Sequence, residues 1–170
     1  MALRISGLTI VIAACTLAQA AQAGVFTDKQ KAELLAAHNR YRTEVSETAL
    51  IWSDDLAAGA QVWAQHLAND VHSLQHSGLP GQGENLAMWS AGRSSLTQLV
   101  DMWGAEKRYF IESSFPSVST TGDWKAVGHY TQMIWKKTSQ VGCGLATGGG
   151  YDFLVCRYTP QGNYMGEKVY

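Results

Sequence analysis

Histidine is the residue type in this sequence that can take the most chemical roles, because a neutral imidazole can ligate a metal or transfer a proton near neutral pH. The chain has five, His38, His66, His72, His76 and His129. His129 lies in the segment GHYTQMIWKKTSQVGCG, residues 128–144. Its side chain could pack, bind a metal or move protons, and the segment alone does not distinguish these roles.

A local metal pair is not expected from the other histidines. His72 and His76 stand four residues apart, a spacing that on a helix could place two imidazoles on one metal, as in zinc proteases. No glutamate follows His72, however, and the run SGLPG at 77–81 ends a helix at once. His38 falls on the apolar side of a predicted helix, where a lone histidine is typical of a hydrogen-bonded core.

Two carboxylates occupy positions that are unusual for surface residues. Glu106 stands at the edge of a helical apolar stripe, three residues after Trp103, and a carboxylate there needs a partner to offset burial. Glu84 follows Gly83 and leads into an apolar run, although a surface turn would also suit it. The sequence contains no GxSxG elbow, phosphate loop or paired-cysteine zinc motif. Spacing alone does not show that any of these residues converge.

The first residues predict export from the cytoplasm. A short positive region, MALR, precedes an apolar run at 8–14 that is too short to span a bilayer, and Ala21-Gln22-Ala23 is a small-x-small cleavage site. We therefore predict a signal peptide at 1–23 and one mature domain at 24–170, secreted or, in a bacterium, periplasmic, with no transmembrane segment after cleavage. The alternative is a lipoprotein box, IAAC, which would leave Cys15 lipidated.

The composition fits a single globular domain. Hydrophobic residues make up 46% of the chain and charged ones 16%. Thirteen Lys and Arg against 14 Asp and Glu give a net charge of −1, which offers no electrostatic support for a nucleic-acid partner. The oligomeric state stays open.

Cys143 and Cys156 predict a disulfide within a β-hairpin. Two β-like runs, 140–146 and 151–158, flank three glycines, and pairing the two cysteines directly across the hairpin centres its turn between Gly149 and Gly150. Glycines suit the positive φ of such a turn, and directly opposed residues lie close enough for a disulfide. The alternative is two buried free thiols, but export favours the bridge.

Helices are expected ahead of this hairpin. Thr27 with Gln30 resembles a capping box for a helix to about Arg42, and Ser53 caps a second helix that ends near Asn69 or Asp70. A third is expected at 94–110, a loop at 111–123, a short helix at 127–135 and a short strand at 83–88. Helices followed by a hairpin, without βαβ alternation, predict an α+β fold.

The chain resembles the CAP superfamily, named for cysteine-rich secretory proteins, antigen 5 and pathogenesis-related class 1 proteins. Five motifs carry the resemblance in the family's order and cover nearly the whole mature domain: HNRYR at 38–42; LIW at 50–52 followed by DLA at 55–57; HS at 76–77 with GENLA at 83–87; GHYTQMIW at 128–135; and VCRYTPQGNY at 155–164. The resemblance implies a three-layer α-β-α sandwich around a small, mainly antiparallel sheet, with a large cleft. The chain lacks the extra cysteines of the animal and plant branches.

The resemblance also implies a metal centre. Carried over by motif, the cleft residues are His76, Glu84, Glu106 and His129, able to hold zinc or another divalent metal, with Glu106 as the loosest match. The family's association with sterols and other lipids implies a secreted binding module for a lipid-like or other small extracellular ligand, in defence or host interaction. The alternatives are a metal-dependent, protease-like hydrolase and a structural surface protein with an idle cleft; enzymatic activity is the less favoured reading.

Overall fold

The computed structural model describes residues 26–170, so the predicted signal peptide and Cys15 lie outside the described residues. The helices are α1 (Asp28–Glu44), α2 (Asp54–His66), α3 (Leu96–Gly104) and α4 (Gly128–Ile134). The strands are β1 (Ile51–Trp52), β2 (Gly83–Ser90), β3 (Gln140–Gly148) and β4 (Tyr151–Thr159). Three short turns of other helix types complete the chain: the π-helix η1 (Leu67–Val71) and the 3₁₀ helices η2 (Ala105–Tyr109) and η3 (Trp124–Ala126).

The helix starts follow the capping residues. Thr27 and Gln30 form the predicted capping box, and the Ser53 hydroxyl accepts from the Leu56 amide at the start of α2. The third helix differs from the prediction, because its α-helical part ends at Gly104 and the chain continues as 3₁₀ helix. Gly104 is a weak helix former and lies against the ring of Tyr41, where a Cβ would clash.

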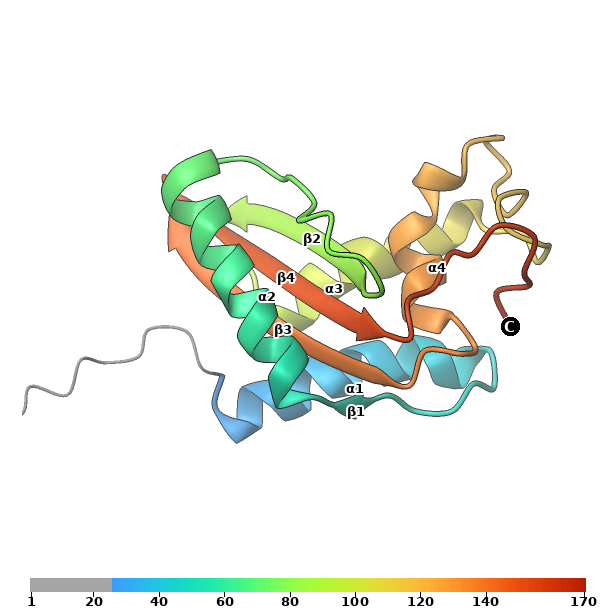
Figure 1. Ribbon diagram of the computed structural model, residues 1–170, viewed down its shortest axis with the longest axis horizontal. Helices are drawn as coiled ribbons and strands as arrows, with labels where there is room; N and C mark the ends of the chain where they lie inside the picture. Colours follow the sequence, from blue (N-terminus) through green and yellow to red (C-terminus); the bar gives the residue numbers. More distant parts are fainter. Residues whose placement is uncertain (1–25) are drawn as a thin grey trace, which may run out of the picture.

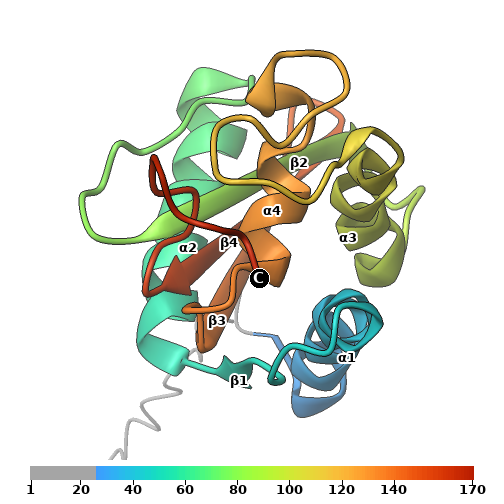
Figure 2. The ribbon, with the colours of Figure 1, turned by 90° about the vertical axis from the view of Figure 1, so that its right-hand side faces the viewer.

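The fold is the predicted α+β sandwich of three layers. The sheet order is β1-β3-β4-β2, with β1 and β3 parallel and the other neighbours antiparallel. In Figures 1 and 2, α2 covers one face of the sheet, and α1, α3 and α4 lie on the other. Strand β1 was not predicted, because two residues are too few to show an alternating pattern. No helix among residues 26–170 has the length and apolar character to cross a membrane.

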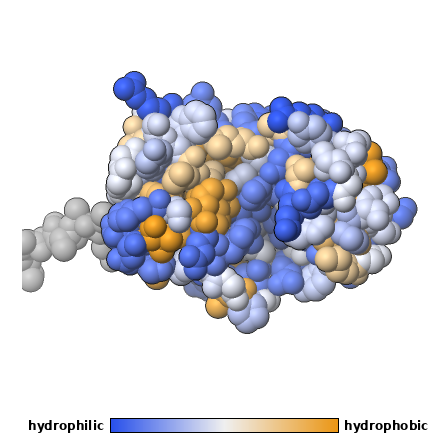
Figure 3. All heavy atoms as spheres, turned by 90° about the horizontal axis from the view of Figure 1, so that it is seen from above, coloured by the Kyte–Doolittle hydropathy of each residue, from blue (hydrophilic) through white to orange (hydrophobic). Residues whose placement is uncertain are grey.

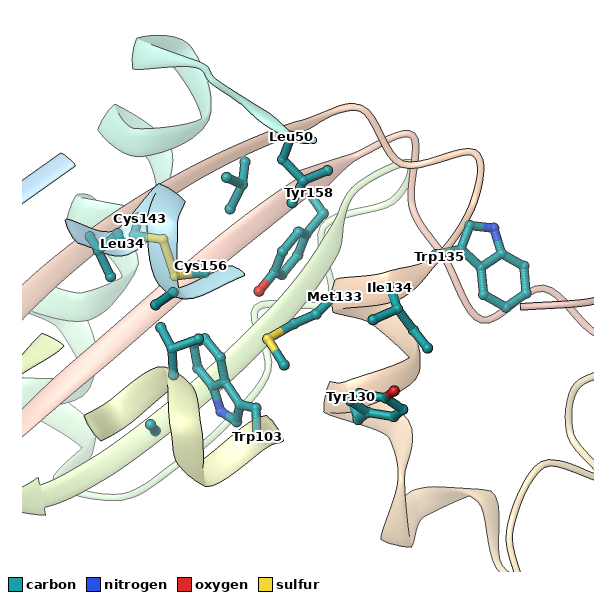
Figure 4. Packing of buried hydrophobic residues seen from close by; sticks show 14 of the residues in the cluster. Leu34, Leu50, Trp103, Tyr130, Met133, Ile134, Trp135, Cys143, Cys156 and Tyr158 are labelled. Carbon is teal, nitrogen blue, oxygen red and sulfur yellow. A yellow bond between two sulfur atoms is a disulfide. The ribbon is translucent and has the colours of Figure 1, made fainter. Parts of the chain in front are cut away.

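The hairpin has the predicted register, and its disulfide is confirmed. Cys143 pairs directly with Cys156, and the two sulfur atoms are bonded. Gly149 and Gly150 form the turn with φ of 59° and 85°, the positive values expected there. Cys143 and Cys156 are both buried against α1, beside the side chains of Leu34 and Tyr158 (Figure 4).

Helix α2 lies so close to β3 that the strand must present glycine to it. A Cβ on Gly144 would stand 2.3 Å from the backbone of Gln61, and Gly142 and Gly148 face equally short distances to α2 and η1. The Gln61 side chain uses this proximity to bond both the amide and the carbonyl of Leu145. The glycines therefore set the spacing between the helix and the sheet.

Gly144→Ala should destabilise the domain by about 1–3 kcal/mol, because the obstacle is helix backbone and α2 has to move. Urea unfolding of the purified protein measures this, with the exposed Ser139→Ala as the matched control, expected within about 0.5 kcal/mol of wild type. Equal stability of the two variants would show that α2 is not held at contact distance.

Candidate metal-binding cleft

One cleft of about 470 Å³ opens between the segment leading into β2 and the start of α4. Most of the residues that line it have polar side chains, with amide, imidazole, carboxylate and ammonium groups among them: His76, Gln82, Gly83, Glu84, Asn85, Trp124, Lys125, Gly128, His129, Gln132, Gln161, Gly162 and Asn163. Seen from above, the middle of the molecule's surface is mainly hydrophilic, with apolar side chains gathered to one side (Figure 3). The cleft brings together three of the four residues taken from the family motifs.

The first half of the site is a histidine held by a buried carboxylate. His76 lies in the segment between η1 and β2 with an exposed ring, and its Nδ1 is 3.0 Å from Glu84 Oε1. Glu84 is the second residue of β2 and also accepts from the Ser77 amide and hydroxyl, at 2.8 and 2.7 Å. Burial acts to raise the pKa of Glu84, but the hydrogen bonds from His76 and Ser77 outweigh it and the pKa is lowered. Glu84 is therefore ionised near neutral pH.

The second half repeats this arrangement with a different carboxylate support. His129 is the second residue of α4, and its Nδ1 is 2.6 Å from Glu106 Oε1 in η2. Glu106 Oε2 accepts from the amides of His129 and Tyr130, each at 3.0 Å. Because Val127, before the helix, offers no side-chain cap, Glu106 caps α4 as well as holding the ring. Glu106 is not among the residues that line the cleft.

The two carboxylates fix which imidazole nitrogen is free. A carboxylate only accepts hydrogen bonds, so Nδ1 of His76 and of His129 carries the proton and Nε2 keeps its lone pair. Metal-binding histidines in proteins are oriented by a carboxylate in this way. Glu84 and Glu106 thus act on the rings, while the Nε2 atoms are the groups that could ligate.

Among the described residues, one group of three possible metal-ligating side chains lies close together, with ligand atoms within 4.8 Å of one another. This group is His38, Cys143 and Cys156. Its sulfur atoms are joined in the disulfide, so they cannot act as the thiolate ligands a metal prefers. No three of His76, Glu84, Glu106 and His129 bring possible ligand atoms within that distance of one another. The described residues therefore do not form a compact four-residue cage around the cleft.

A series of buried hydrogen bonds links His38 to the backbone of His129. The His38 ring donates from Nδ1 to the Leu34 carbonyl at 2.7 Å, which leaves Nε2 to accept from the Tyr158 hydroxyl at 2.9 Å. Asn85 donates to that hydroxyl and to the His129 carbonyl, both at 3.1 Å. Burial lowers the pKa of His38 to about 4, so it is neutral, as predicted for a hydrogen-bonded core histidine.

The remaining sequence expectations have definite outcomes. His72 adopts φ of 56° just after η1 ends, so His72 and His76 do not share a helix face and form no local pair.

Sequence reasoning missed the amide side chains of the cleft wall. Gln132 accepts from the Gly162 amide at 2.7 Å, and Asn163 donates to the Gly128 carbonyl at 2.9 Å, so these side chains hold the wall together. These two side chains and their two backbone partners all lie in the family motifs GHYTQMIW and VCRYTPQGNY, so the motifs could have pointed to them.

Comparison with known proteins fits this geometry. A family model described as "Cysteine-rich secretory protein family" matches residues 35–158. The chain belongs to this family. Among its relatives, pathogenesis-related protein 1A of Nicotiana tabacum is 40% identical over 141 residues, covering 81% of this chain and 79% of the tobacco protein. Venom allergen 5 2 of Polybia paulista is 32% identical over 169 residues, covering 85% and 80%.

Solved structures of other proteins share the fold. A structure titled "Structure of BmVAL-1" superposes with a TM-score of 0.73 at 26% identity, covering 88% of this chain and 85% of its own. "Crystal structure of NaASP2 with Zn2+" superposes with a TM-score of 0.71 at 24% identity, covering 85% and 86%. The α-β-α sandwich predicted from the family motifs is thereby confirmed.

Proposed function

We propose that this protein is an extracellular binding module of the cysteine-rich secretory family whose cleft holds a divalent metal, zinc by preference, between His76 and His129. The observation that carries the proposal is the paired arrangement in which each ring is fixed through Nδ1 by its own carboxylate. When bound, the metal would supply a Lewis-acidic point to which an oxygen or nitrogen atom of a ligand attaches. The plant and wasp relatives favour an extracellular location over a periplasmic one.

The donor set fits zinc better than a hard cation. Neutral imidazole is a common zinc ligand, whereas calcium and magnesium prefer oxygen atoms. Glu84 and Glu106 already accept several hydrogen bonds from His76, Ser77, His129 and Tyr130, and Glu106 does not line the cleft, so the described residues do not supply an oxygen cage. One solved structure that shares this fold has Zn²⁺ in its title.

The hydrogen bonding favours a binding module over a hydrolase. A general base needs a carboxylate oxygen within reach of the proton that it removes. The Glu84 oxygens accept from His76 and Ser77, and the Glu106 oxygens accept from His129 and Tyr130. Both carboxylates are therefore engaged in holding the two histidines, and this role favours a binding module.

The residues that line the two cavities indicate what kind of ligand each could bind. The exposed lining of the main cleft is mostly apolar in area but comes mainly from residues with polar side chains, which suits a ligand with both apolar and polar groups. The predicted sterol- or lipid-like ligand has its best support elsewhere, in a second cavity of about 350 Å³ bounded by Phe26, Trp52 and the disulfide residue Cys143. Lipid binding that survives removal of the metal would point to this second cavity.

Zinc titration by calorimetry tests the metal centre. The wild-type protein should bind about one equivalent, and His76→Ala/His129→Ala should weaken binding by at least about 100-fold, because both ligands are removed. His66→Ala/His72→Ala is the matched control, since it removes two histidines outside the cleft, one half-buried and one exposed, and should leave the titration unchanged. Equal heats from the wild type and the cleft variant would exclude the proposed centre.

A further inference from the structure

Arg157 is a buried cation that the metal hypothesis does not use. It lies on β4 directly opposite Glu84 of β2, so the two side chains share the sheet face that α2 covers. Arg157 is only 8% exposed, and its Nε is 3.4 Å from Glu84 Oε2. That Nε is buried and makes no hydrogen bond, so the contact is an ion pair and not an ordinary donor–acceptor bond.

Helix α2 makes room for this guanidinium. Gly59 stands in the middle of α2, where glycine is less favourable than alanine. A Cβ at this position would lie 2.6 Å from Arg157 Nη1. The glycine therefore leaves the space that the charged group occupies beneath the helix.

We propose that Arg157 is the positioning residue of the His76 half of the cleft. This inference rests on the proposed function, because it gives a role to a contact behind one of the two proposed ligands. Arg157 holds the Glu84 carboxylate in place from the side facing α2, and Glu84 in turn accepts from Nδ1 of the His76 ring. Without this neighbour, the carboxylate can turn away from His76 toward water, which removes the acceptor for His76 Nδ1.

The His129 half provides an internal comparison. Glu106 is held by two backbone amides at the start of α4, and within residues 26–170 none of its hydrogen bonds or ion pairs comes from a lysine or an arginine. A change at Arg157 should therefore alter the surroundings of His76 and leave those of His129 unchanged. General loosening of the fold would affect both rings.

The test uses Arg157→Met, which removes the charge at similar length, and Arg157→Lys, which keeps a charge without the planar fork. Imidazole ¹⁵N NMR of the metal-free protein at mildly alkaline pH reports which ring nitrogen carries the proton. In wild type, His76 and His129 should both be protonated at Nδ1. In Arg157→Met, His76 should become a mixture of both tautomers while His129 is unchanged, and Arg157→Lys should restore part of the His76 signal.

Gly59→Ala separates positioning from stability. The methyl group displaces the guanidinium yet improves the helix, so the melting temperature should be equal or higher while the His76 tautomer shifts as in Arg157→Met. Zinc should bind about 10-fold more weakly to both variants, the usual effect of losing a group behind a ligand.

Each outcome decides one question. An unchanged His76 tautomer in both Arg157→Met and Gly59→Ala would overturn the positioning role. Failure of the wild-type protein to bind zinc would overturn the proposed function alone, because the tautomer is measured without metal.

Discussion

Arg42→Met should destabilise the protein by about 3–5 kcal/mol, enough to leave much of it unfolded. The Arg42 side chain is 1% exposed at the end of α1. Its guanidinium donates to four backbone carbonyls, those of Thr48, Met133, Trp135 and Thr138, at 2.6 to 3.1 Å. Methionine fills a similar volume but leaves these carbonyls without a donor, which costs far more than the lost attraction itself.

Loss of the Arg42 guanidinium should also disturb the cleft. The Met133 and Trp135 carbonyls lie at the end of α4, and His129 lies near its beginning. Urea unfolding followed by circular dichroism measures the loss. Arg40→Met is the matched control: the Arg40 guanidinium is half-exposed and pairs with Asp101 on the surface, so its removal should cost at most about 1 kcal/mol. Similar losses for the two variants would contradict the role given to Arg42.

Acid should weaken the fold through His38 by on the order of 3 kcal/mol. Burial, reinforced by the Arg42 charge and opposed by the bond to Leu34, lowers the pKa of His38 from 6.5 to about 4. Between pH 6.5 and about pH 4, the His38 side chain is protonated in the unfolded chain but neutral in the native state. The free energy of unfolding therefore falls as the pH drops from 6.5 to 4, and this contribution levels off below pH 4.

The experiment compares the pH dependence of urea unfolding in wild type and His38→Gln. Glutamine does not titrate, so the variant should be less stable at neutral pH but should show a flatter profile over this window. The difference between the two slopes isolates His38 from the other titrating groups. Parallel profiles would show that His38 does not carry the acid sensitivity.

Much of the fold could be predicted because local chemistry specified it. Thr27 and Ser53 fixed two helix starts through short-range caps. The cysteines and the glycine turn together fixed the hairpin register, because a one-residue slip would place Cys143 and Cys156 on opposite faces. The third helix was predicted too long because Gly104 meets Tyr41, a contact from another helix that sequence spacing does not report.

The candidate site could be predicted only in part. Family motifs supplied the four residues, but the division of labour between them required geometry. Glu106 behaves as a helix cap as much as a site residue, since the His129 and Tyr130 amides both donate to it. Arg157 was visible in a quoted motif, yet its link to Glu84 depends on the pairing of β2 with β4, and strands so far apart in sequence show no register in advance.

X-ray absorption at the zinc edge of the metal-loaded protein tests the central claim most directly. We predict two imidazole nitrogens at about 2.0–2.1 Å, with oxygen atoms completing the coordination and no sulfur. In His129→Ala, the imidazole contribution should fall to one. A spectrum with zinc–sulfur scattering, or one that His76→Ala and His129→Ala leave unchanged, would contradict a metal held between these two side chains.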